Sequence, residues 1–186
     1  MFDVYTRLGF EHILDPKGYD HILFVIALCA IYTVKEWKKV LILVTAFTIG
    51  HSLTLALSAL KILTISASLV ETLIPITIIL TCIHNILLGR MNNEKPGTNY
   101  LLALGFGFIH GLGFSNFFKA MLGQEESIVG PLFYFNVGVE LGQIIIVMLT
   151  LALSFIIVDL IKIKQKYYTY LLSGAILIWA VKMMIG

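Results

Sequence analysis

The chain has 186 residues, of which 59% are hydrophobic and only 13% are charged. This composition excludes an ordinary soluble domain, and the net charge of +2 gives no sign of a nucleic-acid partner. The charged residues collect in short breaks between long apolar runs, which is typical of a polytopic membrane protein. We therefore expect an all-α fold, with residues 1–186 forming a single integral domain in a lipid bilayer.

In chain order, residues 1–17 predict a short amphipathic lead-in, with aromatic and leucine side chains available to sit at the membrane interface. Six transmembrane helices in one bundle should follow, each ending where charged or turn-forming residues interrupt an apolar run. Cys29 and Cys82 fall inside these runs, which predicts free, buried thiols. The predicted spans cover residues 19–34, 38–60, 66–89, 99–121, 131–157 and 167–185.

Basic residues near the span ends are divided unevenly between the two predicted sides of the membrane. Eight fall on one side and five on the other, and the positive-inside rule assigns the richer side to the cytoplasm. Both termini are then expected outside. The richer side comprises Lys35, Lys38, Lys39, Arg90, Lys95, Lys162, Lys164 and Lys166.

An Asp-His pair stands where the polar amino terminus gives way to the first apolar run. Pro16 and Gly18 break the chain just before it, so Asp20 and His21 should occupy the first turn of a helix. A simple helix-capping Asp beside an interfacial His is the alternative. With the predicted orientation, one set of titratable residues falls between the outer surface and the midplane, and only His84 lies clearly deeper. That set comprises Asp20, His21, His51, Glu71, His110 and Glu140.

These residue types suit a metal ion. A carboxylate within the membrane must be neutralised, paired or metal-bound, and imidazoles with carboxylates are ligands for first-row divalent cations. Imidazole suits nickel, cobalt, zinc, copper and iron, so the residues alone leave the identity of the metal open. A proton relay needs the same residue types, and a single His can serve only as a hydrogen-bonded link between helices. The predicted ligands are His12, Asp20, His21, His51, Glu71, His110 and Glu140.

Other polar residues are predicted to line a pathway or support the ligands. Asn136, Glu140 and Gln143 are spaced i, i+4 and i+7, so they form one polar stripe on a helix. Glycines flank His110, where they allow either close helix packing or room for a ligand. The pathway or supporting residues are Ser52, His84, Asn85, Asn136 and Gln143.

Five motifs follow one another in residues 9–143: GFxHI…GxDHILF, FTxxHSxTL, VE, GFGFIHGLGF and FNxGVELGQ. Together they resemble the second branch of the HupE/UreJ family of small integral membrane proteins. The resemblance implies a hydrogenase or urease accessory protein that moves nickel, or sometimes cobalt, across the inner membrane of a bacterium. It also implies that His12, Asp20 and His21 form the signature for metal recognition, although the seven residues between His12 and Asp20 exceed the usual spacing.

Two main functions remain open. In a transporter, the ion would be captured at Asp20 and His21 and passed inward through His51 and His110. In an intramembrane metal-dependent hydrolase, the substrate would be a lipid or a membrane-embedded peptide. Transport is favoured, and a passive assembly factor or sensor ranks last. The sequence does not decide whether the chain forms a homo-oligomer. The hydrolase would use Glu71 or Glu140 as general base and Ser52 to stabilise an oxyanion or a metal ligand.

Overall fold

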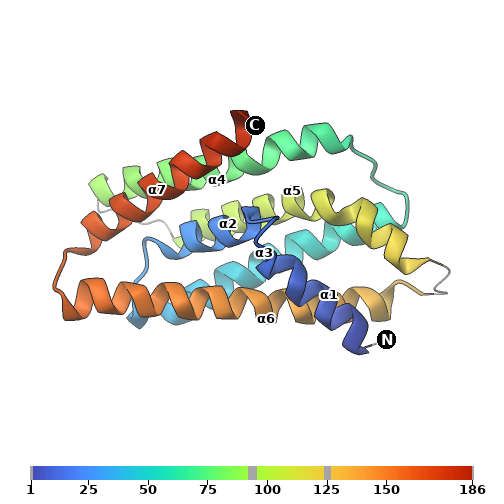
Figure 1. Ribbon diagram of the computed structural model, residues 1–186, viewed down its shortest axis with the longest axis horizontal. Helices are drawn as coiled ribbons and strands as arrows, with labels where there is room; N and C mark the ends of the chain where they lie inside the picture. The colour runs from blue at the N-terminus through green and yellow to red at the C-terminus, as the bar shows by residue number, and fades with distance from the viewer. Residues whose placement is uncertain (1, 92–95, 124–126, 186) are drawn as a thin grey trace.

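The computed structural model describes residues 2–91, 96–123 and 127–185, and within these ranges it is helical without a strand (Figure 1). This confirms the all-α prediction. A short 3-10 helix, η1 (Val34–Glu36), precedes α3, and a π-helical segment, η2 (Phe155–Leu160), extends α6. The α-helices are α1 (Phe2–Leu14), α2 (Asp20–Cys29), α3 (Trp37–Ala59), α4 (Ala67–Met91), α5 (Pro96–Leu122), α6 (Val129–Ser154) and α7 (Gln165–Ile185).

Five segments of the described chain are long and apolar enough to cross a membrane, which makes this a multi-pass membrane protein. The predicted first span, residues 19–34, is not among them. Its helix, α2, ends at Cys29 after 10 residues and rises about 15 Å, roughly half of a bilayer's hydrocarbon core. The five segments are Val34–Ala59, Ala67–Leu87, Gly97–Leu122, Val129–Leu160 and Gln165–Ile185.

The amino-terminal helices α1 and α2 follow one another along the bundle, with α1 toward one end and α2 in the middle (Figure 1). The expected lead-in is a helix, α1, but it packs against α6 and does not lie apart at the interface. Gly9 faces the backbone carbonyl of Phe135, and Gly138 faces that of Thr6, so a Cβ at either glycine would overlap the opposite backbone. The chain leaves α1 at Leu14 and, as predicted from Pro16 and Gly18, starts a new helix at Asp20.

Side chains from distant helices satisfy the backbone around the buried end of α2. Asn85 Nδ2 donates to the carbonyl oxygen of Ala27 at 2.7 Å, and Thr169 Oγ1 donates to that of Ala30 at 2.8 Å. Gln165 Nε2 donates to the carbonyls of Ala30 and Tyr32, each at 3.3 Å. Non-helical backbone at membrane depth is tolerated where protein supplies such partners, so α2 can stop inside the bundle.

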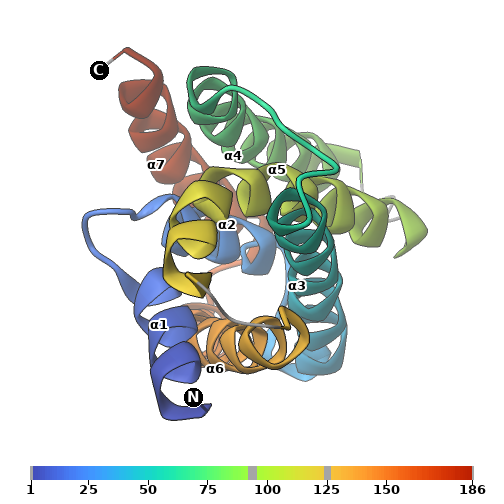
Figure 2. The same ribbon diagram turned by 90° about the vertical axis from the view of Figure 1, so that its right-hand side faces the viewer.

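Glycines bring α3 and α5 into backbone contact. Gly50 on α3 faces the carbonyl of Leu104, and Gly107 on α5 faces that of Phe47. Gly111, next to His110, faces the backbone of His51. Of the two uses predicted for the glycines around His110, close packing therefore holds for Gly107 and Gly111. This contact places α3, which carries His51, beside α5, which carries His110, while α4 and α7 pair on another side of the bundle (Figure 2).

Candidate metal centre

Four of the five histidines meet where α1, α2, α3 and α5 come together. The ring centroid of His21 on α2 lies 4.5 Å from that of His12 on α1 and 5.7 Å from that of His51 on α3. It also lies 5.0 Å from that of His110 on α5. Residues separated by almost a hundred positions in the sequence thus converge on the break between α1 and α2.

Two overlapping groups of side chains have the spacing of metal ligands. One ligand atom from each of His12, His21 and His51 lies within 4.8 Å of the others, and Asp20, His21 and His110 form a second group within the same limit. Because His21 belongs to both, the groups form one contiguous site. We call these five residues the His cluster.

Asp20 fixes the proton position on His21. Nδ1 of His21 lies 3.1 Å from Oδ1 of Asp20, and an ionised carboxylate can only accept a hydrogen bond. Nδ1 therefore carries the hydrogen, and Nε2 keeps a free lone pair. That Nε2 is buried and has no hydrogen-bond partner in the protein. A carboxylate behind an imidazole in this way is the usual support for a histidine that binds metal.

Thr77 on α4 fixes the proton position on His110 in the same manner. The Thr77 hydroxyl donates to the carbonyl oxygen of Ile74 at 2.7 Å, so its oxygen is left to accept from Nε2 of His110 at 3.0 Å. Nδ1 of His110 then has the free lone pair, and it too is buried without a partner.

The cluster is closed in by aromatic side chains. The rings of Phe114 and Phe135 lie 3.9 Å and 5.8 Å from that of His12, measured between centroids, and Phe24 lies 5.1 Å from that of His110. His51 and His110 are both 0% exposed. The buried ring nitrogens without a protein partner are His12 Nε2, His21 Nε2, His51 Nδ1, His51 Nε2 and His110 Nδ1.

Buried polar atoms are almost always hydrogen-bonded, so an enclosed set of unpartnered imidazole nitrogens requires an explanation. Nitrogen donors of this kind, with one carboxylate beside them, fit a divalent first-row cation. The groups contain no sulfur ligand, since both Cys29 and Cys82 are free and buried elsewhere. The chemistry of the donor set therefore favours nickel, cobalt or zinc over a soft ion such as Cu(I).

Two open clefts border the connection between α1 and α2. One, of about 670 Å³, is lined by His12 together with the acidic residues Glu11 and Asp15. The other, of about 730 Å³, reaches Asp20 and is lined by Glu71 and Lys182 among others. Each cleft thus touches one member of the His cluster.

The profile of the family described as HupE / UreJ protein, second branch, matches residues 1–185. The chain belongs to the HupE/UreJ family. The match extends beyond the motifs of residues 9–143 to include the last helix. No curated protein and no solved structure shows significant similarity to the chain.

Five of the seven ligands predicted for this HupE/UreJ protein lie in the His cluster, and two lie outside both ligand groups. Glu71 is exposed and lines the cleft that reaches Asp20. Glu140 accepts hydrogen bonds from Thr45 at 2.6 Å and Thr48 at 2.7 Å, at the contact between α3 and α6.

The residues predicted to line a pathway or support the ligands make different hydrogen bonds. Ser52 and Asn136 bond to their own helices, donating to the carbonyls of Thr48 at 2.6 Å and Leu132 at 2.8 Å. Asn85 holds the end of α2. Gln143 is 0% exposed, and its Oε1 lies 2.8 Å from Oγ1 of Thr48.

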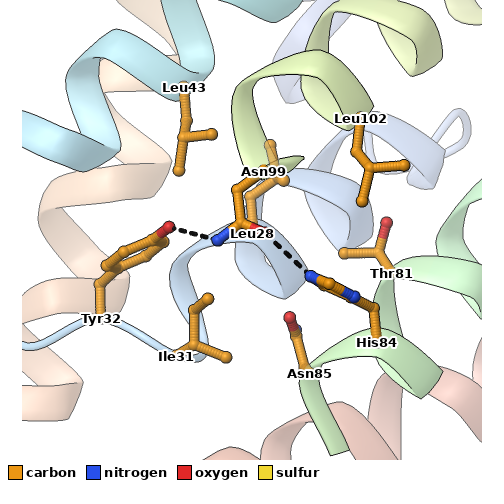
Figure 3. A pocket seen from close by; sticks show the side chains of 9 residues that line it. All are labelled: Leu28, Ile31, Tyr32, Leu43, Thr81, His84, Asn85, Asn99 and Leu102. Atoms are coloured by element: carbon orange, nitrogen blue, oxygen red, sulfur yellow. Dashed lines mark hydrogen bonds between the residues drawn. The ribbon is translucent and has the colours of Figure 1, made fainter. Parts of the chain in front are cut away.

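A separate small pocket is lined by His84 and several other polar and apolar side chains (Figure 3). Nε2 of His84 lies 2.9 Å from Oδ1 of Asn99, whose Nδ2 donates to the hydroxyl of Tyr32 at 2.9 Å. The cavity between them has about 20 Å³, enough for one water molecule. Thr81 lines this pocket and donates to the carbonyl of Thr77 at 2.8 Å, so a polar stripe on α4 runs from this pocket to the His cluster.

Sequence reasoning missed several residues that shape the site. Thr77 has a detectable signal, because it shares the i, i+4, i+7 spacing of Thr81 and His84 on one face of α4. Phe114 and Phe135 have no such signal, since an aromatic residue that walls a site looks the same in sequence as one that fills a core.

Proposed function

We propose that this protein binds a divalent transition-metal cation, nickel or cobalt, at the His cluster and carries it across the inner membrane of a bacterium. The observation that carries the proposal is the convergence of buried, unpartnered imidazole nitrogens beside Asp20. The HupE/UreJ family is linked to nickel and cobalt uptake, which agrees with this donor set.

The members of the cluster have distinct roles. His12, His21 and His51 bind the ion, because their ligand atoms form one group and His21 and His51 each have a free, buried nitrogen. Asp20 orients His21 and offsets part of the ion's charge. His110 receives the ion next, since it shares His21 and Asp20 with the second group.

The ion's path follows from how the helices are broken. We infer that α1 and α2 are two half-helices that together make a sixth crossing, as discontinuous helices do in many transporters. The basic connections at residues 30–36 and 161–164 lie at the same end of the molecule, away from the amino terminus (Figure 1). That end is the cytoplasmic one by the positive-inside rule, so both termini lie outside. The ion enters through the clefts and leaves past Thr77, Thr81 and His84.

The hydrolase alternative has one observation in its favour. Three imidazoles beside an open cleft resemble a catalytic zinc site, which keeps one coordination position for water. The general base predicted for the hydrolase has less support, because Glu71 and Glu140 lie outside both ligand groups. Ser52 donates to the backbone of its own helix. These contacts favour transport.

Uptake of radioactive nickel or cobalt into liposomes containing the purified protein tests the proposal. We expect uptake by the wild type and none by His51→Ala. Leu101→Ala, which changes a side chain that is 70% exposed on the surface of the bundle, should show wild-type uptake. If the wild type moves no nickel, cobalt, zinc or iron under any gradient, the transport proposal is wrong. One zinc per chain, retained tightly through purification without uptake, would support the hydrolase instead.

A further inference from the structure

The cleft that reaches Asp20 contains side chains of both charges. Its volume is about 730 Å³, within the range of clefts that hold small organic ligands. Lys17 comes from the connection before α2, Glu71 from α4 and Lys182 from α7. The cleft beside His12 differs, because the charged residues that line it are both acidic. We call the cleft lined by Lys17, Asp20, Glu71 and Lys182 the mixed-charge cleft.

The charged groups of the mixed-charge cleft remain available to a ligand. Lys17, Glu71 and Lys182 are exposed, and within the described residues none of them belongs to an ion pair. Asp20 offers one oxygen as well. Its Oδ1 makes both contacts with His21, and no hydrogen bond among the described residues reaches its Oδ2. The cleft therefore presents two ammonium groups and one free carboxylate, with a further carboxylate oxygen from Asp20.

This combination of charges suits neither a bare cation nor a bare anion. Lys17 and Lys182 repel a divalent cation, and the carboxylates of Asp20 and Glu71 repel an anion. A ligand that carries one negative and one positive group satisfies both pairs at once, because each of its charges then lies beside the opposite charge of the protein. The mixed-charge cleft therefore fits a zwitterionic ligand.

The mixed-charge cleft lies at the level of lipid headgroups. Glu71 stands about 6 Å along the helix from the start of α4, and Lys182 about 5 Å from the end of α7. Trp179, which is 50% exposed, is one turn before Lys182, and Nζ of Lys182 lies 5.2 Å from the centroid of its ring. The ring of Tyr19 lies 5.9 Å from the same indole. Trp and Tyr beside a lysine near the end of a span are typical of the membrane–water interface.

We propose that the mixed-charge cleft binds the headgroup of a phospholipid that carries a primary ammonium group, which is the chemistry of phosphatidylethanolamine. Lys17 and Lys182 donate to the phosphate, and the ammonium group donates to Glu71. The bound phosphate also neutralises the two lysines, so a cation that approaches Asp20 through this cleft meets less repulsion. The headgroup site does not depend on the proposed transport, because none of its contacts involves a metal.

Native mass spectrometry of the protein released from lipid nanodiscs tests the site. The nanodiscs contain equal parts of phosphatidylethanolamine, phosphatidylcholine and phosphatidylglycerol with identical acyl chains. The methyl groups of phosphatidylcholine prevent its ammonium group from donating to Glu71, and phosphatidylglycerol has a phosphate but no ammonium group. The wild type should retain phosphatidylethanolamine about fivefold more than phosphatidylcholine, the effect of one exposed charge pair. Equal retention of these two, or preferential retention of phosphatidylglycerol, would overturn the proposal.

Single substitutions assign the two halves of the headgroup. Glu71→Gln should remove the preference for phosphatidylethanolamine over phosphatidylcholine. Lys182→Gln should lower the retention of both, because the phosphate is common to them. The matched control is Lys61→Gln, since Lys61 is exposed between α3 and α4 and does not line the cleft, and it should retain lipids like the wild type. Wild-type retention in both cleft variants would contradict the assignment.

Coupling with a water-soluble carbodiimide locates the bound headgroup, because this reagent joins a primary amine to a nearby carboxylate as an amide. In liposomes of phosphatidylethanolamine, peptide mass spectrometry should find the lipid attached to Glu71 in the wild type and in Lys61→Gln, and much less of it in Lys182→Gln. Lipid attached to other carboxylates but not to Glu71 would overturn the proposal. Neither measurement uses a metal, so failure of the proposed transport would leave both readouts intact.

Discussion

Nε2 of His110 lies 3.0 Å from Oγ1 of Thr77, and that hydroxyl is itself committed to the carbonyl of Ile74 at 2.7 Å. This pair of contacts forces the hydrogen of His110 onto Nε2 and leaves the buried Nδ1 without a hydrogen-bond partner in the protein. A residue with no charge, on a helix that contributes no ligand to either group, therefore decides which nitrogen of His110 can bind an ion.

The first prediction concerns this threonine. Thr77→Val removes the acceptor for His110 while keeping the side-chain shape, and it should weaken nickel or cobalt binding about 10-fold to 100-fold, as loss of a partner behind a metal-binding histidine does. Thr77→Ser keeps the hydroxyl and should bind like the wild type. Competition with a coloured chelator measures both. Equal affinity in the valine variant would show that His110 does not contribute to equilibrium metal binding.

The second prediction separates binding from passage. His51→Ala removes a fully buried member of the ligand group and should abolish stoichiometric metal binding. His84→Ala lies in the separate pocket around Asn99 and should leave binding intact while slowing uptake into liposomes. Equilibrium dialysis and uptake are measured on the same preparations. Normal uptake by His84→Ala would remove this histidine from the pathway.

The third prediction uses two glycines on the same helix. A methyl group at Gly111 would overlap the backbone of His51 and the side chain of Thr54, whereas one at Gly105 meets nothing within 4 Å. Gly111→Ala should separate α3 from α5 and lower the thermal unfolding temperature, with a cost of about 1–3 kcal/mol typical of overpacking. Metal binding should fall with it. Gly105→Ala should match the wild type in both measurements.

The fourth prediction concerns acidity and Asp20. Imidazoles must be neutral to bind a metal, so protons compete and affinity should fall as the pH is lowered through the range in which histidines are protonated. Asp20→Asn keeps an oxygen that can accept from His21 but loses the negative charge, whereas Asp20→Ala loses both. Affinity at neutral pH should therefore decrease from wild type to Asn to Ala. Equal affinities for the three proteins would contradict the role given to Asp20.

The membrane-spanning helices and several residues of the site could be predicted from the sequence. Apolar runs long enough to cross a bilayer mark the five continuous spans, and Pro16 with Gly18 marks the break before Asp20. The predicted depth of the polar residues grouped His21, His51 and His110 in one half of the membrane. The cost of burying a carboxylate added Glu71 and Glu140, which lie outside both ligand groups.

The end of α2 could not be predicted, because the residues after Cys29 remain apolar. A hydropathy pattern does not show where a helix ends within an apolar run. That end depends on Asn85, Gln165 and Thr169, which are brought to it only by the tertiary fold. Glu140 illustrates the same limit. Its depth in the membrane is readable from sequence, but its partners Thr45 and Thr48 come from another helix.

The most direct test of the account is the X-ray absorption spectrum of the nickel- or cobalt-loaded protein, recorded for the wild type and for His51→Ala. We predict imidazole scattering from the groups of His12, His21 and His51, no sulfur in the first shell, and loss of this signal in the variant. A spectrum that shows sulfur ligands, or one that matches the hydrated ion in both proteins, would contradict the central claim that the buried histidines hold the transported metal.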